Sequence, residues 1–201
     1  DSVLGSSRYA RDVGGEVGGN TSLWRYPEQQ ISSADTSINK TRLPKTFGSK
    51  WVKFVAGETN ADIGGGKHDN VTEHLSSLGV ENLIYDPFNR TLEHNNAVVA
   101  RINNGGADTG TVNNVLNVIK EPAARQLVIE QSANAVKADG TVYFKIFEGA
   151  KTGKGAKPLT KYDNWQENRL AESYVQEIQK HFGDVVRRDT DIIIAKNPKS
   201  V

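Results

Sequence analysis

The residues best suited to binding chemistry gather around a run of three glycines. Asp62 stands two residues before Gly64, which Gly65 and Gly66 follow directly. Glycine lets the backbone turn sharply, and a ligand can lie against its main-chain N–H groups because no Cβ stands in the way. A second acid, Asp86, follows an apolar run and precedes a proline. A carboxylate in that place can accept two hydrogen bonds from a ribose diol, so the two motifs indicate a nucleotide-type binding turn.

Spacing separates this turn from two better-known glycine-rich turns. The dinucleotide fingerprint G-x-G-x-x-G, anchored on Gly64 and Gly66, needs a third glycine where the chain has Asp69. That carboxylate would face a pyrophosphate, which disfavours NAD and FAD. The phosphate-loop pattern also fails, since no G-K-[ST] follows four residues after a glycine. The turn is best described as acid-x-Gly-x-Gly with a second acid after the next strand.

Three motifs in this order resemble those of class I S-adenosylmethionine-dependent methyltransferases. The family's first motif reads acid-x-Gly-x-Gly-x-Gly, and residues 62–68 read Asp-Ile-Gly-Gly-Gly-Lys-His, so His68 replaces the third glycine. The family's ribose-binding acid matches Asp86, within Tyr-Asp-Pro-Phe. The family's strand-four motif is similar to residues 108–119, and the resemblance spans residues 59–195, two thirds of the chain.

The resemblance implies a fold, an activity and a cofactor. The fold is α/β, a Rossmann-like three-layer sandwich whose sheet is mostly parallel with an antiparallel C-terminal strand. The activity is that of a methyltransferase (EC 2.1.1.-) using S-adenosyl-L-methionine, and the acceptor is not encoded in any recognisable motif. The residues implied to bind the cofactor are Asp62, Gly64, Gly65, Gly66, Asp86, Pro87, Phe88, Asn113, Asn114 and Val115.

Asn113 ends a predicted strand and Asn114 follows it, and both are expected to flank the cofactor, with Asn113 also a catalytic candidate. Amides offer donors and acceptors without a charge to desolvate, and a sulfonium needs weak acceptors near its charged centre. In the alternative interpretation they only cap the turn into the next helix. The stretch is not Asn/Asp-Pro-Pro-Tyr, which argues against the amino-methylating DNA enzymes of the family.

Four further residues are assigned to the acceptor side of the cleft. Glu148 ends a predicted strand, where a carboxylate could act as a base or bind a cationic group, or be merely a solvated charge. Trp165, Gln166 and Arg169 form a polar and aromatic cluster at the expected start of the last large helix, with Asn164 as its cap. We expect this cluster to recognise the substrate.

The remaining elements alternate as in a parallel α/β unit. The family's usual third strand does not fit into this sequence, because the strand expected at 109–113 begins almost directly after Gly105 and Gly106. We therefore expect the sheet to lack the third strand or to keep only a remnant of it. A turn is expected at Asp139 and Gly140. Helices are predicted at residues 70–78, 91–103 and 121–137, and strands at 82–85, 109–113, 141–147 and 191–195, the last paired with 185–187.

Composition is that of one domain, since 201 residues with 36% apolar side chains suffice for a single core. Residues 1–30 are glycine- and serine-rich and predict a flexible arm or linker, whose end Trp24 and Tyr26 would anchor. Residues 31–201 form the predicted methyltransferase domain. Residues 30–54 are expected either to fold over the cofactor mouth or to be a solvated loop.

Charge and residue usage narrow the partners. The net charge of +1 does not indicate nucleic acid as a partner, although it leaves that possibility open. No apolar run is long enough to span a bilayer, so a cytoplasmic protein with no membrane partner is expected. The chain has no cysteine for disulfides or thiolate sites, and its four histidines lack metal-site spacing.

Two other classes of function stay open at this point. The domain could be a non-catalytic cofactor-binding or interaction module of a larger polypeptide. It could also be a Rossmann-like enzyme that uses another nucleotide.

Overall fold

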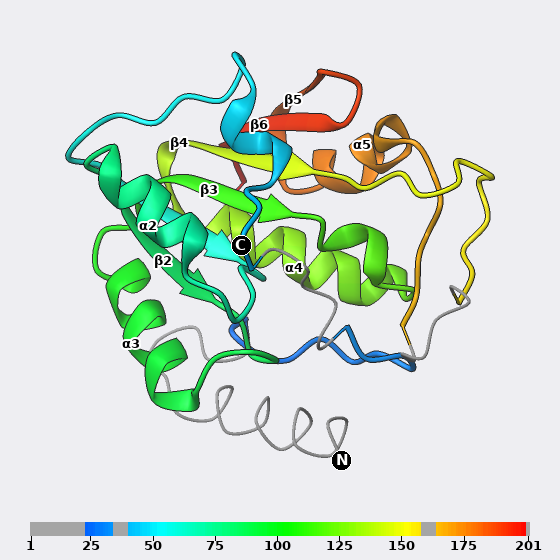
Figure 1. The fold of residues 1–201 in the computed structure, drawn as a ribbon, viewed down its shortest axis with the longest axis horizontal. Coiled ribbons are helices and arrows are strands. Elements are labelled where there is room, and N and C mark those ends of the chain that lie inside the picture. Colours follow the sequence, from blue (N-terminus) through cyan, green and yellow to red (C-terminus); the bar gives the residue numbers. More distant parts are fainter. Residues whose placement is uncertain (1–22, 34–39, 158–163, 200–201) are drawn as a thin grey trace.

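The computed structural model of the protein describes residues 23–33, 40–157 and 164–199. Within these residues the fold is a six-stranded mixed sheet with the strand order β2-β1-β3-β4-β6-β5, packed between helices (Figure 1). The first four strands pair in parallel, and β6 pairs antiparallel with both β4 and β5. The strands are β1 (Thr59–Ile63), β2 (Glu81–Tyr85), β3 (Ala107–Asn113), β4 (Val136–Lys145), β5 (Phe182–Arg188) and β6 (Ile192–Pro198).

Helices connect the strands as a parallel sheet requires. The α-helices are α2 (Asn70–Ser77), α3 (Leu92–Asn103), α4 (Pro122–Ala135) and α5 (Val175–Gln179). Short 3₁₀ turns are η1 (Lys45–Gly48), η2 (Leu116–Val118) and η3 (Ala171–Tyr174). Thr91 caps α3, since its side chain accepts a hydrogen bond from the N–H of His94. Pro122 opens α4, where its missing N–H costs nothing.

Opposite crossover directions place the helices on both faces of the sheet. The chain moves from β1 outward to β2 and then back past β1 to β3, and right-handed crossovers therefore put α2 and α3 on opposite faces. The buried side chains agree with this, because α3, α4 and α5 share one large apolar cluster. On the other face, Val71 and Leu75 of α2 pack with Phe47 and Phe54 in a separate small cluster.

The expected fold class is confirmed, including the absence of the family's third strand. The chain leaves α3 at Asn103 and enters β3 at Ala107, so β2 is the edge of the sheet in the part of the chain that the structure describes. The helices expected at residues 70–78 and 91–103 correspond to α2 and α3, and the expected C-terminal hairpin corresponds to β5 and β6.

The turn expected at Asp139 and Gly140 is wrong. Strand β4 runs without interruption from Val136 to Lys145. Its pairing with β3 shifts register between Ala107 and Thr109. Gly140 is needed there because a Cβ would lie 2.7 Å from Cβ of Val136. The glycine therefore marks a close approach within a bulged strand rather than a reversal of the chain.

The helix expected to open around Asn164 and Trp165 is also wrong. The backbone is not helical from 164 to 170, and Gln166 forms an isolated antiparallel bridge with Ala156. Asn168 has a φ of 51°, a left-handed conformation that no helix interior accommodates. The helical turns begin only at Ala171, and residues 161–163 of the expected start lie outside the described residues.

The expected anchoring of the N-terminal segment by Trp24 and Tyr26 is confirmed. Trp24 is buried with its ring edge-on to Tyr85, and the ring of Tyr26 lies 4.2 Å from that of Phe88 between centroids. Residues 1–22 of the predicted flexible arm lie outside the described residues, so its flexibility stays a prediction. No helix in the ranges 23–33, 40–157 and 164–199 has both the length and the apolarity to cross a bilayer.

Trp24→Ala is expected to lower the free energy of unfolding by about 3–5 kcal/mol, because it opens a cavity beneath β2. Trp51→Ala is the matched control, since Trp51 is 40% exposed and its replacement should cost less than about 1 kcal/mol. Urea denaturation of the full chain measures both values. If Trp24→Ala lowered the free energy of unfolding no more than Trp51→Ala does, the segment containing Trp24 would not be part of the core.

Candidate functional site

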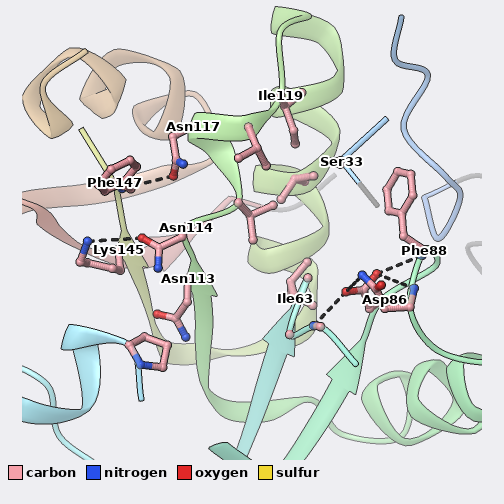
Figure 2. Close-up of a pocket in the computed structure, with 18 of the residues that line it drawn as sticks. Ser33, Ile63, Asp86, Phe88, Asn113, Asn114, Asn117, Ile119, Lys145 and Phe147 are labelled. Carbon is pink, nitrogen blue, oxygen red and sulfur yellow. Dashed lines mark hydrogen bonds between the residues drawn. The ribbon is translucent and has the colours of Figure 1, made fainter. Parts of the chain in front are cut away.

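A cavity of about 920 Å³ opens at the carboxyl ends of the parallel strands (Figure 2). This is the edge where ligands bind in open α/β sheets, and the volume is within the range of small-molecule sites. Its lining includes the glycine turn after β1, the loop after β2 and the polar ends of β3 and β4. The segment before β1 also contributes Ser33, Arg42, Leu43, Pro44 and Lys45, as expected of a segment that folds over the mouth.

The backbone of the turn after β1 requires its glycines. Gly64 and Gly66 have φ angles of 75° and 82°, in the left-handed region that other residues rarely adopt. Gly65 lies so close to its neighbours that a Cβ would stand 2.7 Å from Oδ2 of Asp62 and 3.0 Å from Cγ2 of Ile84. All three glycines line the cavity.

Asp86 joins the glycine turn to the loop after β2. Its Oδ2 accepts hydrogen bonds from the N–H of Gly66 at 2.9 Å and from Nδ2 of Asn89 at 3.1 Å. Its Oδ1 accepts from the N–H groups of Phe88 at 2.9 Å and Asn89 at 3.1 Å (Figure 2). A carboxylate has about four lone-pair sites, and the protein uses all of them here. Burial nevertheless raises the pKa of Asp86 from its usual value.

Arg90 ties the same two segments together a second time. Its Nε donates to the carbonyl of Gly66 at 2.8 Å, and its Nη2 donates to the carbonyl of His68 at 3.0 Å. Nη2 also lies 2.9 Å from a carboxylate oxygen of Asp69. Sequence reasoning missed this residue, because no motif spacing marks an arginine that acts through backbone carbonyls.

Asp62 is buried at the end of β1 and held by neighbouring strands. Its Oδ1 accepts from the hydroxyl of Thr111 at 2.9 Å, and its Oδ2 lies 3.5 Å from Nδ2 of Asn82. Burial is the main cause that raises its pKa to about 6, with the hydrogen bonds to Thr111 and Asn82 acting in the opposite direction. A carboxyl group of this kind changes charge near neutral pH inside a cavity.

The asparagines at the end of β3 are held by donors from other elements. Oδ1 of Asn113 accepts from the hydroxyl of Thr46 at 2.5 Å, and Oδ1 of Asn114 accepts from the ammonium of Lys145 at 3.3 Å. Asn114 has a φ of 57°, which asparagine tolerates better than most residues. Both asparagines line the cavity, so the interpretation that they merely cap a turn is incomplete.

Lys145, at the end of β4, is a second residue that sequence reasoning missed. Its side chain is 10% exposed and its Nζ lies 3.4 Å from a carboxylate oxygen of Asp191 and 2.8 Å from the carbonyl of Ile146. Burial lowers its pKa, and Asp191 acts against that shift. Asp191 also pairs with Lys45 at 2.9 Å. A lysine at the end of an apolar strand gives no signal in the sequence, because its burial depends on the later strand β6.

Comparison with solved structures finds a protein with a similar fold. Burkholderia thailandensis 1,6-didemethyltoxoflavin-N1-methyltransferase, solved with 1,6-didemethyltoxoflavin and S-adenosylhomocysteine, aligns over 72% of this chain and 72% of that chain with a TM-score of 0.51 and 14% identity. The chain has the class I methyltransferase fold. At this identity the likeness concerns the fold alone.

Two further solved structures give lower TM-scores. The S-adenosylmethionine-dependent methyltransferase SibL, in its apo form, gives a TM-score of 0.49 at 16% identity over 71% of this chain, which spans 51% of SibL. A TehB-like SAM-dependent methyltransferase from Corynebacterium glutamicum gives 0.44 at 12% identity over 72% of this chain and 82% of that one. No protein-family model matches the chain, and no curated protein matches its sequence.

The methyltransferase fold brings most of the residues predicted from sequence to one cavity. Trp165 and Gln166 line it although they are not helical, and Gln166 is held by Asn117 and by the carbonyl of Phe147. All ten residues expected to bind the cofactor line the cavity: Asp62, Gly64, Gly65, Gly66, Asp86, Pro87, Phe88, Asn113, Asn114 and Val115.

Glu148 and Arg169 are not among the residues that line this cavity. Oε2 of Glu148 accepts a hydrogen bond from the N–H of Ala171 at 2.8 Å, at the start of η3. The guanidinium of Arg169 lies 3.8 Å from the ring centroid of Tyr174 and pairs with Glu177 at 3.1 Å. Both side chains hold the segment 164–179 in place, and the structure gives neither of them contact with the cavity.

Asp62→Asn is expected to flatten the dependence of stability on pH. The folded Asp62 has a pKa of about 6 against 3.8 for the ordinary carboxyl, so the folded chain retains a proton that the unfolded chain has lost. Stability therefore falls as the pH rises from about 4 through 6, by about 3 kcal/mol from this group. Urea denaturation at pH 4 and pH 7 measures this. Between these two pH values the free energy of unfolding should fall by about 3 kcal/mol more in the wild type than in Asp62→Asn.

Asp139→Asn is the control for this measurement, because Asp139 is exposed. It should follow the wild-type pH dependence. The charge of Asp86 also raises the pKa of Asp62, so the difference between wild type and Asp62→Asn includes the interaction of the two acids. If the free energy of unfolding changed equally with pH in the wild type and in Asp62→Asn, the raised pKa of Asp62 would be contradicted.

Proposed function

We propose that the protein is an S-adenosylmethionine-dependent methyltransferase (EC 2.1.1.-). The observation that carries the proposal is the wall formed by Gly64, Gly65 and Gly66 between the buried acids Asp62 and Asp86. This wall lies at the strand ends of a class I methyltransferase fold, and it faces a cavity large enough for a nucleoside-sized ligand.

The glycine turn is proposed to hold the methionine end of the cofactor. With no Cβ at Gly64 and Gly65, the turn packs closely against Val115 and Asp62, and its main chain forms part of the cavity wall. Asp62 would attract the ammonium group, and Pro87 and Phe88 would lie beside the nucleoside. Because the protein already occupies all four acceptor sites of Asp86, a ribose hydroxyl must displace one of its donors. Nδ2 of Asn89 is the only side-chain donor among the four, so it is the one that can rotate away.

Gln29 is proposed to contact the adenine. It lines the cavity, and neither its Oε1 nor its Nε2 has a hydrogen-bond partner among the described residues, although both atoms are shielded from solvent. Leaving a buried amide unpaired costs free energy. An amide offers one acceptor and one donor, and the amino group and ring nitrogen of adenine complement them.

The cofactor supplies a methyl group that is already activated on a sulfonium. The residues of this chain therefore have to align donor and acceptor and to exclude water, which is the part of catalysis that rigid positioning provides. The hydrogen bonds from Thr46 and Lys145 fix the side chains of Asn113 and Asn114 on the wall of the cavity. Trp165 and Gln166 belong to the same lining and would contact the acceptor.

Isothermal titration of the full chain with S-adenosylmethionine and S-adenosylhomocysteine tests the proposal. We expect dissociation constants of about micromolar for both, that is about −8 kcal/mol, and no heat with NAD. No binding of either sulfur compound would overturn the proposal, and binding of NAD alone would reassign the cavity to another nucleotide.

Asp86→Ala is expected to abolish cofactor binding and also to lower the free energy of unfolding. The substitution leaves the N–H groups of Gly66, Phe88 and Asn89 without their acceptor, at a cost of about 1–3 kcal/mol for each that stays buried. Asp139→Ala removes an exposed acid and should change neither value. Normal affinity in Asp86→Ala would show that the carboxylate has no part in the site.

Gln29→Leu is expected to weaken binding of S-adenosylhomocysteine about tenfold, by removing a pair of hydrogen bonds of about 1–1.5 kcal/mol in total. An analogue of S-adenosylhomocysteine with hypoxanthine in place of adenine tests whether Gln29 contacts the base, because this analogue lacks the amino group of adenine. Wild type should prefer the adenine compound and Gln29→Leu should not. An unchanged preference in the variant would mean that another residue contacts the base.

A further inference from the structure

Two side-chain amides at the end of β3 line the cavity, and the orientation of the Asn114 amide is fixed from behind. A lysine ammonium carries only donors, so the atom of Asn114 that faces Nζ of Lys145 at 3.3 Å must be Oδ1. Oδ1 of Asn113 is likewise engaged by the hydroxyl of Thr46. Each Nδ2 therefore points elsewhere, and neither has a hydrogen-bond partner within the residues that the structure describes. Figure 2 shows both amides side by side at the end of β3.

Lys145 is a positioning residue in this arrangement. Its Nζ lies within reach of three acceptors, Oδ1 of Asn114 at 3.3 Å, the carbonyl of Ile146 at 2.8 Å and Oδ2 of Asp191 at 3.4 Å. An ammonium has three N–H bonds, so these contacts use all of them. The lysine thus holds the amide of Asn114 rather than offering a free hydrogen bond of its own.

The charge of this end of the cavity is opposite to that of the glycine end. Lys45 and Lys145 line it, and Asp191 is the acid in the described lining that pairs with both of them. Asp86 lies at the other end (Figure 2), and the glycine turn that it holds directly follows β1, the strand of Asp62. Charged groups in a partly desolvated cavity act on a ligand more strongly than they would in water. The end near Lys145 therefore favours an anion.

Apolar surface lies beside the two amides. Phe147 lies two residues after the end of β4 and is 56% exposed, and Leu43, which also lines the cavity, is 40% exposed. Exposed large apolar side chains that line a cavity mark a ligand surface more often than scattered ones do. A flat ring against Phe147 would bring a substituent oxygen toward the amides.

We propose that Asn113 and Asn114 form the acceptor subsite, and that it takes a flat molecule bearing an anionic oxygen, a carboxylate or phenolate. This inference rests on the proposed function, because it places the acceptor across the cavity from the cofactor. It reverses the role expected for the asparagines from sequence, since they act as donors to the acceptor and not as acceptors toward the sulfonium. A cationic or amine acceptor fits this subsite poorly.

The test uses the full chain saturated with S-adenosylhomocysteine and probes of one size and different charge. Benzoate and 4-hydroxybenzoate carry the anionic oxygen, benzamide is the neutral isostere and benzylamine is the cation. Titrations followed by ¹⁵N–¹H spectra of the side-chain amides should show benzoate binding at least tenfold more tightly than benzylamine. The amide signals of Asn113 and Asn114, assigned by their loss in single variants, should shift with benzoate.

Asn114→Asp removes the N–H donors while keeping the shape and the contact with Lys145. It should lose at least tenfold in affinity for benzoate and keep affinity for S-adenosylhomocysteine within twofold. Asn104→Asp introduces the same charge at an exposed position after α3 and should behave as wild type. Lys145→Met should shift the amide signals of Asn114 before any probe is added, and Lys145→Arg should restore them.

The two proposals fail in different measurements. A wild type that binds S-adenosylhomocysteine but prefers benzylamine to benzoate, or binds no probe, would overturn the assignment of the subsite alone. Retention of benzoate affinity in Asn114→Asp would do the same. A wild type that does not bind S-adenosylhomocysteine would overturn the proposed function itself.

Discussion

The cavity depends on the carboxylate of Asp86 and the four hydrogen bonds that it accepts. A carboxylate buried to this extent is stable in the fold only when its lone pairs are satisfied. Three of its donors are backbone N–H groups of Gly66, Phe88 and Asn89, so the bonds fix main chain on both sides of the site. Arg90 ties the same segments through carbonyls. The ends of β1 and β2 therefore form one rigid wall.

The glycine turn and the strand-ending acid could be predicted from sequence because their causes are local. Left-handed φ angles at Gly64 and Gly66 demand glycine, and a proline after Asp86 stops the strand wherever the rest of the chain lies. The position of Asn113 and Asn114 on the cavity could be predicted for the same reason, because they stand at the carboxyl end of a parallel strand. Even the missing strand could be predicted, since it follows from the short distance between α3 and β3.

The parts that could not be predicted come from contacts between distant segments. Trp165 lies in a sequence typical of a helix start, but the pairing of Gln166 with Ala156 and its hydrogen bond with Asn117 keep the backbone extended. Local propensity is a weak prior where tertiary contacts compete with it. The direction of Glu148 is decided in the same way, by an N–H group far along the chain. The burial of Lys145 needs Asp191, which only the fold brings near.

The opposed charges of the two ends of the cavity also account for the position of Glu148. A general base is needed only when an acceptor must lose a proton in the reaction. Nearby cations lower the pKa of an acidic oxygen, so an acceptor held beside Lys45 and Lys145 would be bound already deprotonated. A base is then not required beside it, and the carboxylate at this end, Asp191, is already paired with both lysines. Glu148 instead stabilises the start of η3. The acids Asp62 and Asp86 act on the other end of the cavity.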